Sequence, residues 1–130
     1  MRVLLLPIER EVYAIELAAL RSVVGDPQVF VIPTAPPEII GALNLRGEIV
    51  ALLDTARALG VGTLGAVGFA AVVDHPYGTV ALAAEGRPET ALLGQPVAAG
   101  HLPGTVGSFA VGTTVVTLLD PGALLVLATA

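Results

Sequence analysis

Few side chains in this chain of 130 residues have a type and spacing suited to catalysis. Asp54 and Asp120 each follow an apolar run that ends in two leucines. Two carboxylates that share one proton can act as general acid and general base, which is the chemistry that this pair would offer. An aspartate that follows a strand can also cap the next helix, and we regard capping as the simpler interpretation of both residues.

The enzymatic alternative is a hydrolase of the aspartic protease type. Residues 51–56 resemble the hydrophobic-Asp-Thr-Gly loop of those enzymes, and Asp120 supplies a second aspartate. However, Ala56 stands where that loop needs glycine, and Pro121 stands where the second copy needs threonine or serine. We therefore predict no proteolytic activity.

Other catalytic signals in the sequence are weaker. Residues 60–65 match the Gly-x-Gly-x-x-Gly dinucleotide motif, but they follow an expected helical turn and precede a strand-like segment, the reverse of the required order. The sequence has no lysine, which excludes a P-loop. His75 and His101 lack metal-ligand spacing and suit turns, while Ser22 and Ser108 lack a Gly-x-Ser-x-Gly context. We predict a flexible loop at 60–65, no cofactor, no metal and no enzyme activity.

The composition points to a compact protein with many turns, because 55% of the residues are hydrophobic, 13% are charged, and glycine and proline number 15 and 10. The net charge is −5 and the six basic residues are scattered arginines, which argues against nucleic acid as a partner. The apolar runs 3–6 and 64–73 are too short for a signal peptide or a membrane span. We expect a cytoplasmic protein without direct membrane insertion, and the absence of cysteine is compatible with this.

Short apolar runs between turn signals predict an all-β fold. The expected strands are residues 3–8, 12–17, 29–32, 43–45, 49–53, 69–73, 79–83, 106–111 and 115–119. Many are apolar at almost every position, so we expect several to be buried on both sides. One helix is well signalled at 55–59, with Asp54 as its cap and Gly60 as its left-handed end. Residues 20–24 and 123–127 are weaker helix candidates.

An internal repeat organises the chain. Residues 49–54 match 115–120 at an offset of 66, and residues 15–18 match 80–83 at an offset of 65. This pattern predicts a single domain made of two similar β lobes, approximately residues 1–60 and 66–130, which share a hydrophobic core with possible exchange of strands. Chance similarity in so apolar a sequence is the alternative.

The first half of the chain resembles the CheW family. The resemblance rests on Tyr13-Ala14-Ile15, Ile32-Pro33, Ala35-Pro36-Pro37, Asp54 and above all the run from Ile40 to Val50 with its Gly41-Ala42-Leu43-Asn44-Leu45-Arg46-Gly47. It returns at residues 80–85 and 118–120. The resemblance implies two SH3-like five-stranded β-barrels around a common core, with one or two short helices.

The same resemblance implies a function. It indicates a non-catalytic adaptor that couples chemoreceptors to a CheA-type histidine kinase in bacterial chemotaxis, with the receptor's cytoplasmic tip and the kinase regulatory domain as partners. The protein would be cytoplasmic and associated with the membrane through receptor arrays. A CheW-like scaffold of a twitching, gliding or other specialised pathway is the alternative.

Several positions depart from the family pattern. Ala51 stands where proline is usual, Ser22 where an acidic residue is common, and Glu85 where aspartate is usual. The sequence ends at Ala130, so we also expect it to lack the C-terminal helix of longer family members. These departures leave the pathway and the exact partners open.

Arg46 is the main candidate for partner binding, because its fork of donors suits a carboxylate or a carbonyl. Its alternatives are an internal pair with Glu48 or Glu38, or simple exposure to solvent. Asn44 is a second candidate, although a turn with positive φ at Gly47 is its simpler explanation.

Exposed apolar residues around the proline-rich segment 33–37 could form a groove for a receptor helix, with core packing as the competing explanation. The groove candidates are Ile39, Ile40 and Leu43, and Leu20 is a further candidate for partner binding. The prolines at 33, 36 and 37 predict a stiff connector. We assign structural roles in turns or caps to Gly41, Gly47, Asp54 and Asp120.

Overall fold

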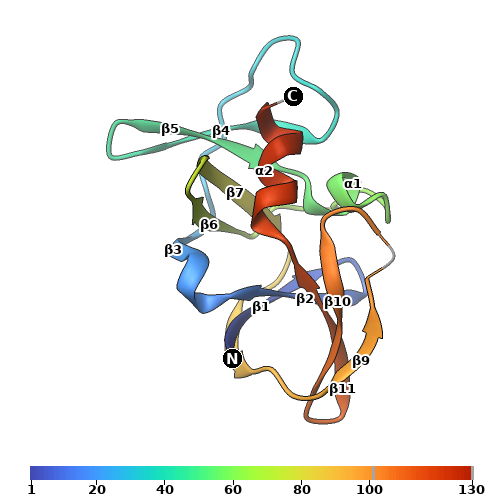
Figure 1. Cartoon of the computed structure of the whole chain (residues 1–130). Helices are drawn as coiled ribbons and strands as arrows, with labels where there is room; N and C mark the ends of the chain where they lie inside the picture. Colours follow the sequence, from blue (N-terminus) through green and yellow to red (C-terminus); the bar gives the residue numbers. More distant parts are fainter. Residues whose placement is uncertain (101, 130) are drawn as a thin grey trace.

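The structure is a computed structural model that describes residues 1–100 and 102–129, and most of it is β-strand (Figure 1). The strands are β1 (Arg2–Ile8), β2 (Glu11–Glu16), β3 (Leu20–Gly25), β4 (Ile39–Leu45), β5 (Glu48–Leu53), β6 (Phe69–His75), β7 (Gly78–Ala84), β8 (Glu89–Leu92), β9 (Pro96–Ala99), β10 (Thr105–Val111) and β11 (Thr114–Leu119). The helical segments are the 3₁₀ turn η1 (Leu17–Ala19), α1 (Thr55–Leu59) and α2 (Pro121–Thr129).

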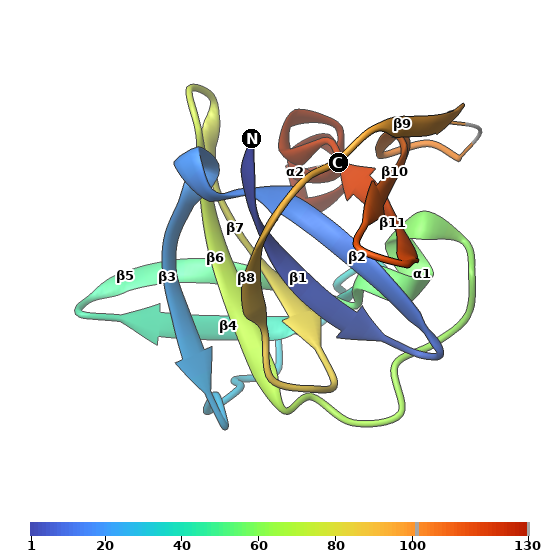
Figure 2. The same ribbon diagram turned by 90° about the horizontal axis from the view of Figure 1, so that it is seen from below.

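The strands form two sheets, and each sheet draws on both halves of the chain. The first sheet has the order β8-β1-β2-β11-β10-β9, and the second has the order β3-β6-β7-β5-β4. The β1–β2 hairpin therefore joins strands from the end of the sequence, while the β6–β7 hairpin joins strands from its first half (Figure 2). Because the two halves interlock in this way, neither sheet can form from one half alone.

The predicted fold class is confirmed in its main features, an all-β protein with two SH3-like lobes and short helices. The first sheet has six strands where five were expected. Among the described residues, neither sheet closes into a complete barrel, because both strand orders end at unpaired edges. The lobes are therefore open, and each presents two edge strands.

The 66-residue repeat is present in the structure. β5 pairs antiparallel with β4 and parallel with β7, where Leu52 lies opposite Ala81. β11 pairs antiparallel with β10 and parallel with β2, where Leu118 lies opposite Ala14. The two Leu-Leu-Asp strands thus occupy equivalent places, and the prediction of a duplicated fold is confirmed.

The second sequence match has a different register from the one expected. Leu52 and Leu118 are 66 residues apart, and their partners Ala81 and Ala14 are 67 apart, not 65. Side chains on a strand alternate with a period of two, so an error of two residues keeps the same face toward the core. This periodicity explains why the pattern at an offset of 65 looked convincing.

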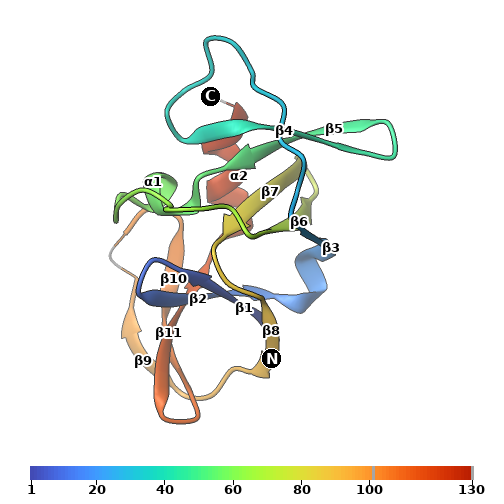
Figure 3. The same ribbon diagram turned by 180° about the vertical axis from the view of Figure 1, so that it is seen from behind.

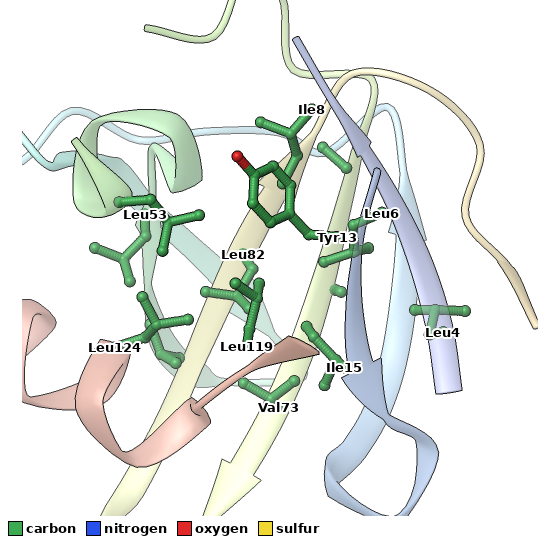
Figure 4. Packing of buried hydrophobic residues seen from close by; sticks show 14 of the residues in the cluster. Leu4, Leu6, Ile8, Tyr13, Ile15, Leu53, Val73, Leu82, Leu119 and Leu124 are labelled. Carbon is green, nitrogen blue, oxygen red and sulfur yellow. The ribbon is translucent and has the colours of Figure 1, made fainter. Parts of the chain in front are cut away.

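The hydrophobic core has three parts, of which the largest lies between the sheets (Figure 4). The β6–β7 hairpin is buried on both faces. Val73 and Leu82 point into the shared part, while Val72 and Ala81 point into the interior of the second sheet. In the first sheet, Val3 belongs to a separate interior cluster. The expectation that several strands are buried on both sides is therefore confirmed.

Three local expectations were wrong. Residues 20–24 form strand β3 instead of a helix, and their burial alternates along the strand as a half-buried edge requires. Residues 29–32 do not form a strand and make only one bridge, between Phe30 and Ala42, while Val31 is 83% exposed. Strands β8 and β9 were not expected at all. A helix, α2, does follow the last strand, as the weaker signal at 123–127 suggested.

The glycine-rich run 60–65 follows α1 as a loop, and His75 ends strand β6. The backbone amides of Leu64 and Gly65 donate to the carboxylates of Asp54 and Glu85. These donors are therefore occupied within the chain instead of forming a phosphate cradle. His101 lies outside the described residues.

The shared core makes the two sheets one cooperative unit, so Leu82→Ala should destabilise both together. Leu82 is 0% exposed, and such a truncation costs roughly 2–5 kcal/mol of unfolding free energy. The matched control is Leu92→Ala, because Leu92 is 67% exposed and should change little. Urea unfolding monitored by circular dichroism checks this, and two separate transitions in either variant would contradict a common core.

Candidate partner-binding site

The β4–β5 hairpin ends in a tight turn that carries Arg46. Leu45 pairs with Glu48, which leaves Arg46 and Gly47 as the two turn residues, with φ values of 52° and 90°. Positive φ at both positions is typical of a type I′ turn, whose twist matches that of the flanking strands. The side-chain oxygen of Asn44 accepts a hydrogen bond of 2.8 Å from the Gly47 amide. Asn44 and Gly47 therefore hold the turn, and Arg46 occupies a position that glycine or asparagine would favour.

The side chain of Arg46 is exposed and, within the part of the chain that the structure describes, is not engaged in an ion pair with a carboxylate. The expected alternative partner Glu48 is bound to Arg21 instead, at 2.9 Å. An arginine in a strained left-handed conformation, without an internal partner, is a better candidate for binding another molecule than for supporting the fold.

A hollow of about 520 Å³ lies beside this turn, between the two edge strands of the open second sheet. It is lined by Arg21, Ser22 and Val24 from β3, by Asn44 and Leu45 from β4, and by Arg46 from the turn. A smaller hollow of about 280 Å³ shares Val24, Asn44 and Leu45 with it and reaches Phe30. The site therefore combines an apolar floor with polar groups and one free cation.

Arg21 stands at the centre of a polar network over the second sheet. Its guanidinium donates to both carboxylate oxygens of Asp74, at 2.8 and 3.0 Å, and to the hydroxyl of Thr79 at 3.0 Å. Thr79 in turn donates to Asp74 at 2.7 Å. With Glu48 as a further acceptor, the network joins β3, β6, β7 and β5.

The network changes the acidity of its members. Hydrogen bonds from Arg21, and then from Thr79, lower the pKa of Asp74. Hydrogen bonds to Asp74 and Glu48 raise the pKa of Arg21. Asp74 and Arg21 therefore both stay charged over a wider pH range than free side chains, and the contact between them persists at physiological pH.

The expected apolar groove takes a different form. Leu43 is only 2% exposed and belongs to the core of the second sheet, so the expectation that it is exposed was wrong. Ile39 and Leu20 are half-buried against the shared core, and Ile40 is half-buried against the core of the second sheet. The apolar lining of the two hollows comes mainly from Val24, Leu45 and Phe30, and Leu43 contributes only to the wall of the smaller one.

Gly41 lies within β4, not in a turn. A Cβ there would come within 2.3 Å of the backbone oxygen of Phe30, so only glycine lets the 29–30 segment approach the strand. Gly107, which is 66 residues further along, meets the backbone oxygen of Ala98 in the same way, at 2.8 Å. The close approach is therefore a feature of both lobes.

Comparison with known proteins decides the family. The model of the CheW-like domain matches residues 2–128, almost the whole chain. This chain belongs to the CheW-like family. No curated protein matches its sequence significantly. Within the described residues, no helix has both the length and the apolar character that a bilayer crossing needs.

A solved structure shares the fold. The crystal structure of the scaffolding protein TtCheW from Thermoanaerobacter tengcongensis is similar to this CheW-like domain, with a TM-score of 0.78 and 18% sequence identity. The match covers 92% of this chain and 88% of that chain. The structural similarity therefore extends through both sheets. At 18% sequence identity it establishes the fold only.

Asp54 and Asp120 of this CheW-like domain lie at the starts of its α-helices. Asp54 is buried, accepts from the Arg57 amide at 3.0 Å, and lies 3.9 Å from the Arg57 side chain. Asp120 accepts from the Gly122 amide at 3.0 Å. Each carboxylate is therefore engaged in capping its own helix, the simpler of the two roles considered from the sequence.

Sequence reasoning missed Arg21, Asp74 and Thr79. Arg21 fell in a segment interpreted as a helix, and its partners Asp74 and Thr79 come from strands more than fifty residues away. One signal was available, because Arg21 follows the apolar Leu20, and a cation in an edge strand marks a position that faces solvent. Nothing local in the sequence indicates that Glu48 and Asp74 share the same arginine.

The backbone at Arg46 gives a stability prediction for this CheW-like domain. Arg46→Asn should increase the free energy of unfolding by about 1 kcal/mol, because asparagine followed by glycine suits a type I′ turn and tolerates positive φ. Arg10→Asn is the control, since Arg10 is an exposed turn residue outside the positive-φ set. Thermal unfolding of both variants tests this, and an unchanged or lower stability of Arg46→Asn would contradict the strained-turn interpretation.

Proposed function

We propose that this CheW-like domain is a non-catalytic adaptor that couples chemoreceptors to a CheA-type histidine kinase in bacterial chemotaxis. The observation that carries the proposal is Arg46, an exposed and unpaired cation on a strained turn beside the hollow between β3 and β4. Family membership supports the same conclusion. The Arg46 turn and the hollow together are the candidate surface for one of the two partners.

The surface suits a protein segment that is apolar and carries a carboxylate or exposed carbonyls. Leu45 and Val24 supply apolar contact, and the guanidinium of Arg46 offers several donors in a fixed plane. Arginine beside a partly enclosed apolar surface is a common centre of binding energy at protein interfaces. The cytoplasmic tip of a chemoreceptor, or the regulatory domain of the kinase, is the partner that we assign to this surface.

Coupling requires that the adaptor bind both partners at once, and the fold is suited to that task. The two sheets share one core, so surfaces on different lobes keep a fixed relative position. A rigid link between two binding sites lets a change at one partner alter the free energy of the complex with the other. Bond chemistry has no part in this mechanism, because Asp54 and Asp120 serve as helix caps.

The proposal places the protein in the cytoplasm, associated with the membrane only through receptor arrays. A net charge of −5 with scattered arginines gives no basis for binding nucleic acid. Contact with the membrane would run through the receptor.

Removal of the Arg46 side chain tests the proposal. Arg46→Ala should weaken binding to one partner by about ten- to a hundredfold, which is the usual cost of losing a charge-assisted hydrogen bond. Isothermal titration calorimetry with a purified receptor-tip fragment, and separately with the kinase regulatory domain, measures this. Arg10→Ala is the control, because it removes the same side chain from the β1–β2 turn of the other sheet.

The melting temperature is measured alongside the affinity, and we expect no decrease for Arg46→Ala. An unchanged affinity for both partners would remove Arg46 from the site. Failure of the unmodified protein to bind either partner would contradict the adaptor function itself.

A further inference from the structure

We propose that Arg21 is a positioning residue for the partner-binding turn: by holding Glu48, it fixes the tip of the β4–β5 hairpin and so the direction in which Arg46 is presented. This inference rests on the proposed function. It assigns a role to the polar network of Arg21, Asp74, Thr79 and Glu48, which the family resemblance did not indicate.

The hairpin tip extends beyond its sheet, so a side-chain contact there can change how well the tip is ordered. β5 pairs with the neighbouring strand β7 only at Leu52 and Leu53, near its end. In Figures 1 and 3 the β4–β5 hairpin projects from the body of the molecule. Residues 46–49 at its tip are all exposed. A two-stranded hairpin without further contacts is only marginally stable in water, so the tip would move unless a side chain held it.

Arg21 supplies that contact from the opposite edge of the sheet. The bulge between Leu20 and Ser22 places Arg21 out of register with β6. Its guanidinium is itself immobilised by the two-oxygen contact with Asp74 and by the hydroxyl of Thr79. The remaining guanidinium nitrogen, Nη1, donates to Glu48, the first residue after the turn. Arg21 therefore links the body of the second sheet to the tip of the β4–β5 hairpin and restrains the motion of that tip.

The second lobe of the repeat gives an independent argument. The β10–β11 hairpin is the structural twin of β4–β5, and its turn residues are Gly112 and Thr113. At the 66-residue offset, Arg46 corresponds to Gly112 and Glu48 corresponds to Thr114, so the twin carries no charge at these positions.

The network is missing from the twin as well. At the 67-residue offset of the strands that flank the hairpins, Arg21 corresponds to Pro88 and Asp74 to Pro7. The same hairpin thus folds in the other lobe without these ion pairs. The polar network occurs only in the lobe that carries Arg46, and the fold does not require it. This favours a role for the network in orienting Arg46.

The first test is on the free protein and requires no partner. The Gly47 amide is bonded to the side chain of Asn44, so its hydrogen exchange reports on the order of the turn. Exchange at Gly47 should be faster in both Arg21→Ala and Glu48→Gln than in the unmodified protein, by about three- to tenfold given the modest strength of exposed ion pairs. Arg10→Ala and Glu11→Gln change the same residue types at the β1–β2 turn and serve as controls.

The second test is the affinity for whichever partner Arg46→Ala weakens. Arg21→Ala and Glu48→Gln should each lower that affinity by about three- to tenfold, and the double variant should lose no more than either single one. In an Arg46→Ala background neither change should have an effect, because both act through Arg46. Arg21→Lys keeps one charged contact and should restore part of the affinity.

Unchanged exchange at Gly47 would overturn the proposal, because the tip would then be ordered without Arg21. A loss of affinity in Arg21→Ala but not in Glu48→Gln would also overturn it, since Arg21 would then contact the partner directly. If Arg46→Ala binds both partners normally, the proposed site fails, whereas the exchange measurement still decides whether Arg21 orders the hairpin.

Discussion

Burial of two hairpins on both of their faces is the constraint on which the rest of the structure depends. The β1–β2 and β6–β7 hairpins each fill the interior of their own lobe with one face and the shared core with the other. A strand with two buried faces must be apolar at nearly every position, which accounts for a hydrophobic content of 55% in a chain of this size. The two lobes cannot separate without exposing this shared core, so they form one rigid body.

Because the core is rigid and buried, binding must take place at the exposed hairpins. The hairpins β4–β5 and β10–β11 occupy equivalent places, yet only the first carries a charged turn and a network of ion pairs beneath it. Duplicated architecture with different surfaces is what an adaptor requires, because its two binding surfaces must recognise different partners while their spacing stays fixed. The strained backbone at Arg46 fits this account, since stability is given up where a side chain must face a partner.

The sequence predicts those features whose causes are local or periodic. The cap at Asp54 and the left-handed Gly60 follow from a few neighbouring residues, and both are found as expected. The Leu-Leu-Asp repeat predicts equivalent strands because the same pattern needs the same surroundings. Features that depend on distant pairing are missed, such as the short edge strands β8 and β9, which have only four residues each and carry little signal of their own.

In the candidate site too, features with local causes were predicted and features that depend on distant residues were missed. Gly47 was expected in a turn from its neighbours alone, whereas Arg21 is defined by partners on three other strands. Leu43 was mistaken for a surface residue because periodicity does not show which face of a two-sided strand meets solvent. The second sheet also brings its two edge strands, β3 and β4, to opposite sides of the same hollow. No single stretch of sequence predicts that arrangement.

The central claim is that one molecule of this CheW-like domain holds receptor and kinase together. Sedimentation velocity on a mixture of the purified chain, a receptor-tip fragment and the kinase regulatory domain tests it most directly. The account predicts a species that contains all three proteins and is absent when the chain is left out. Two binary complexes that compete for the chain, with no ternary species at saturating concentrations, would contradict the account.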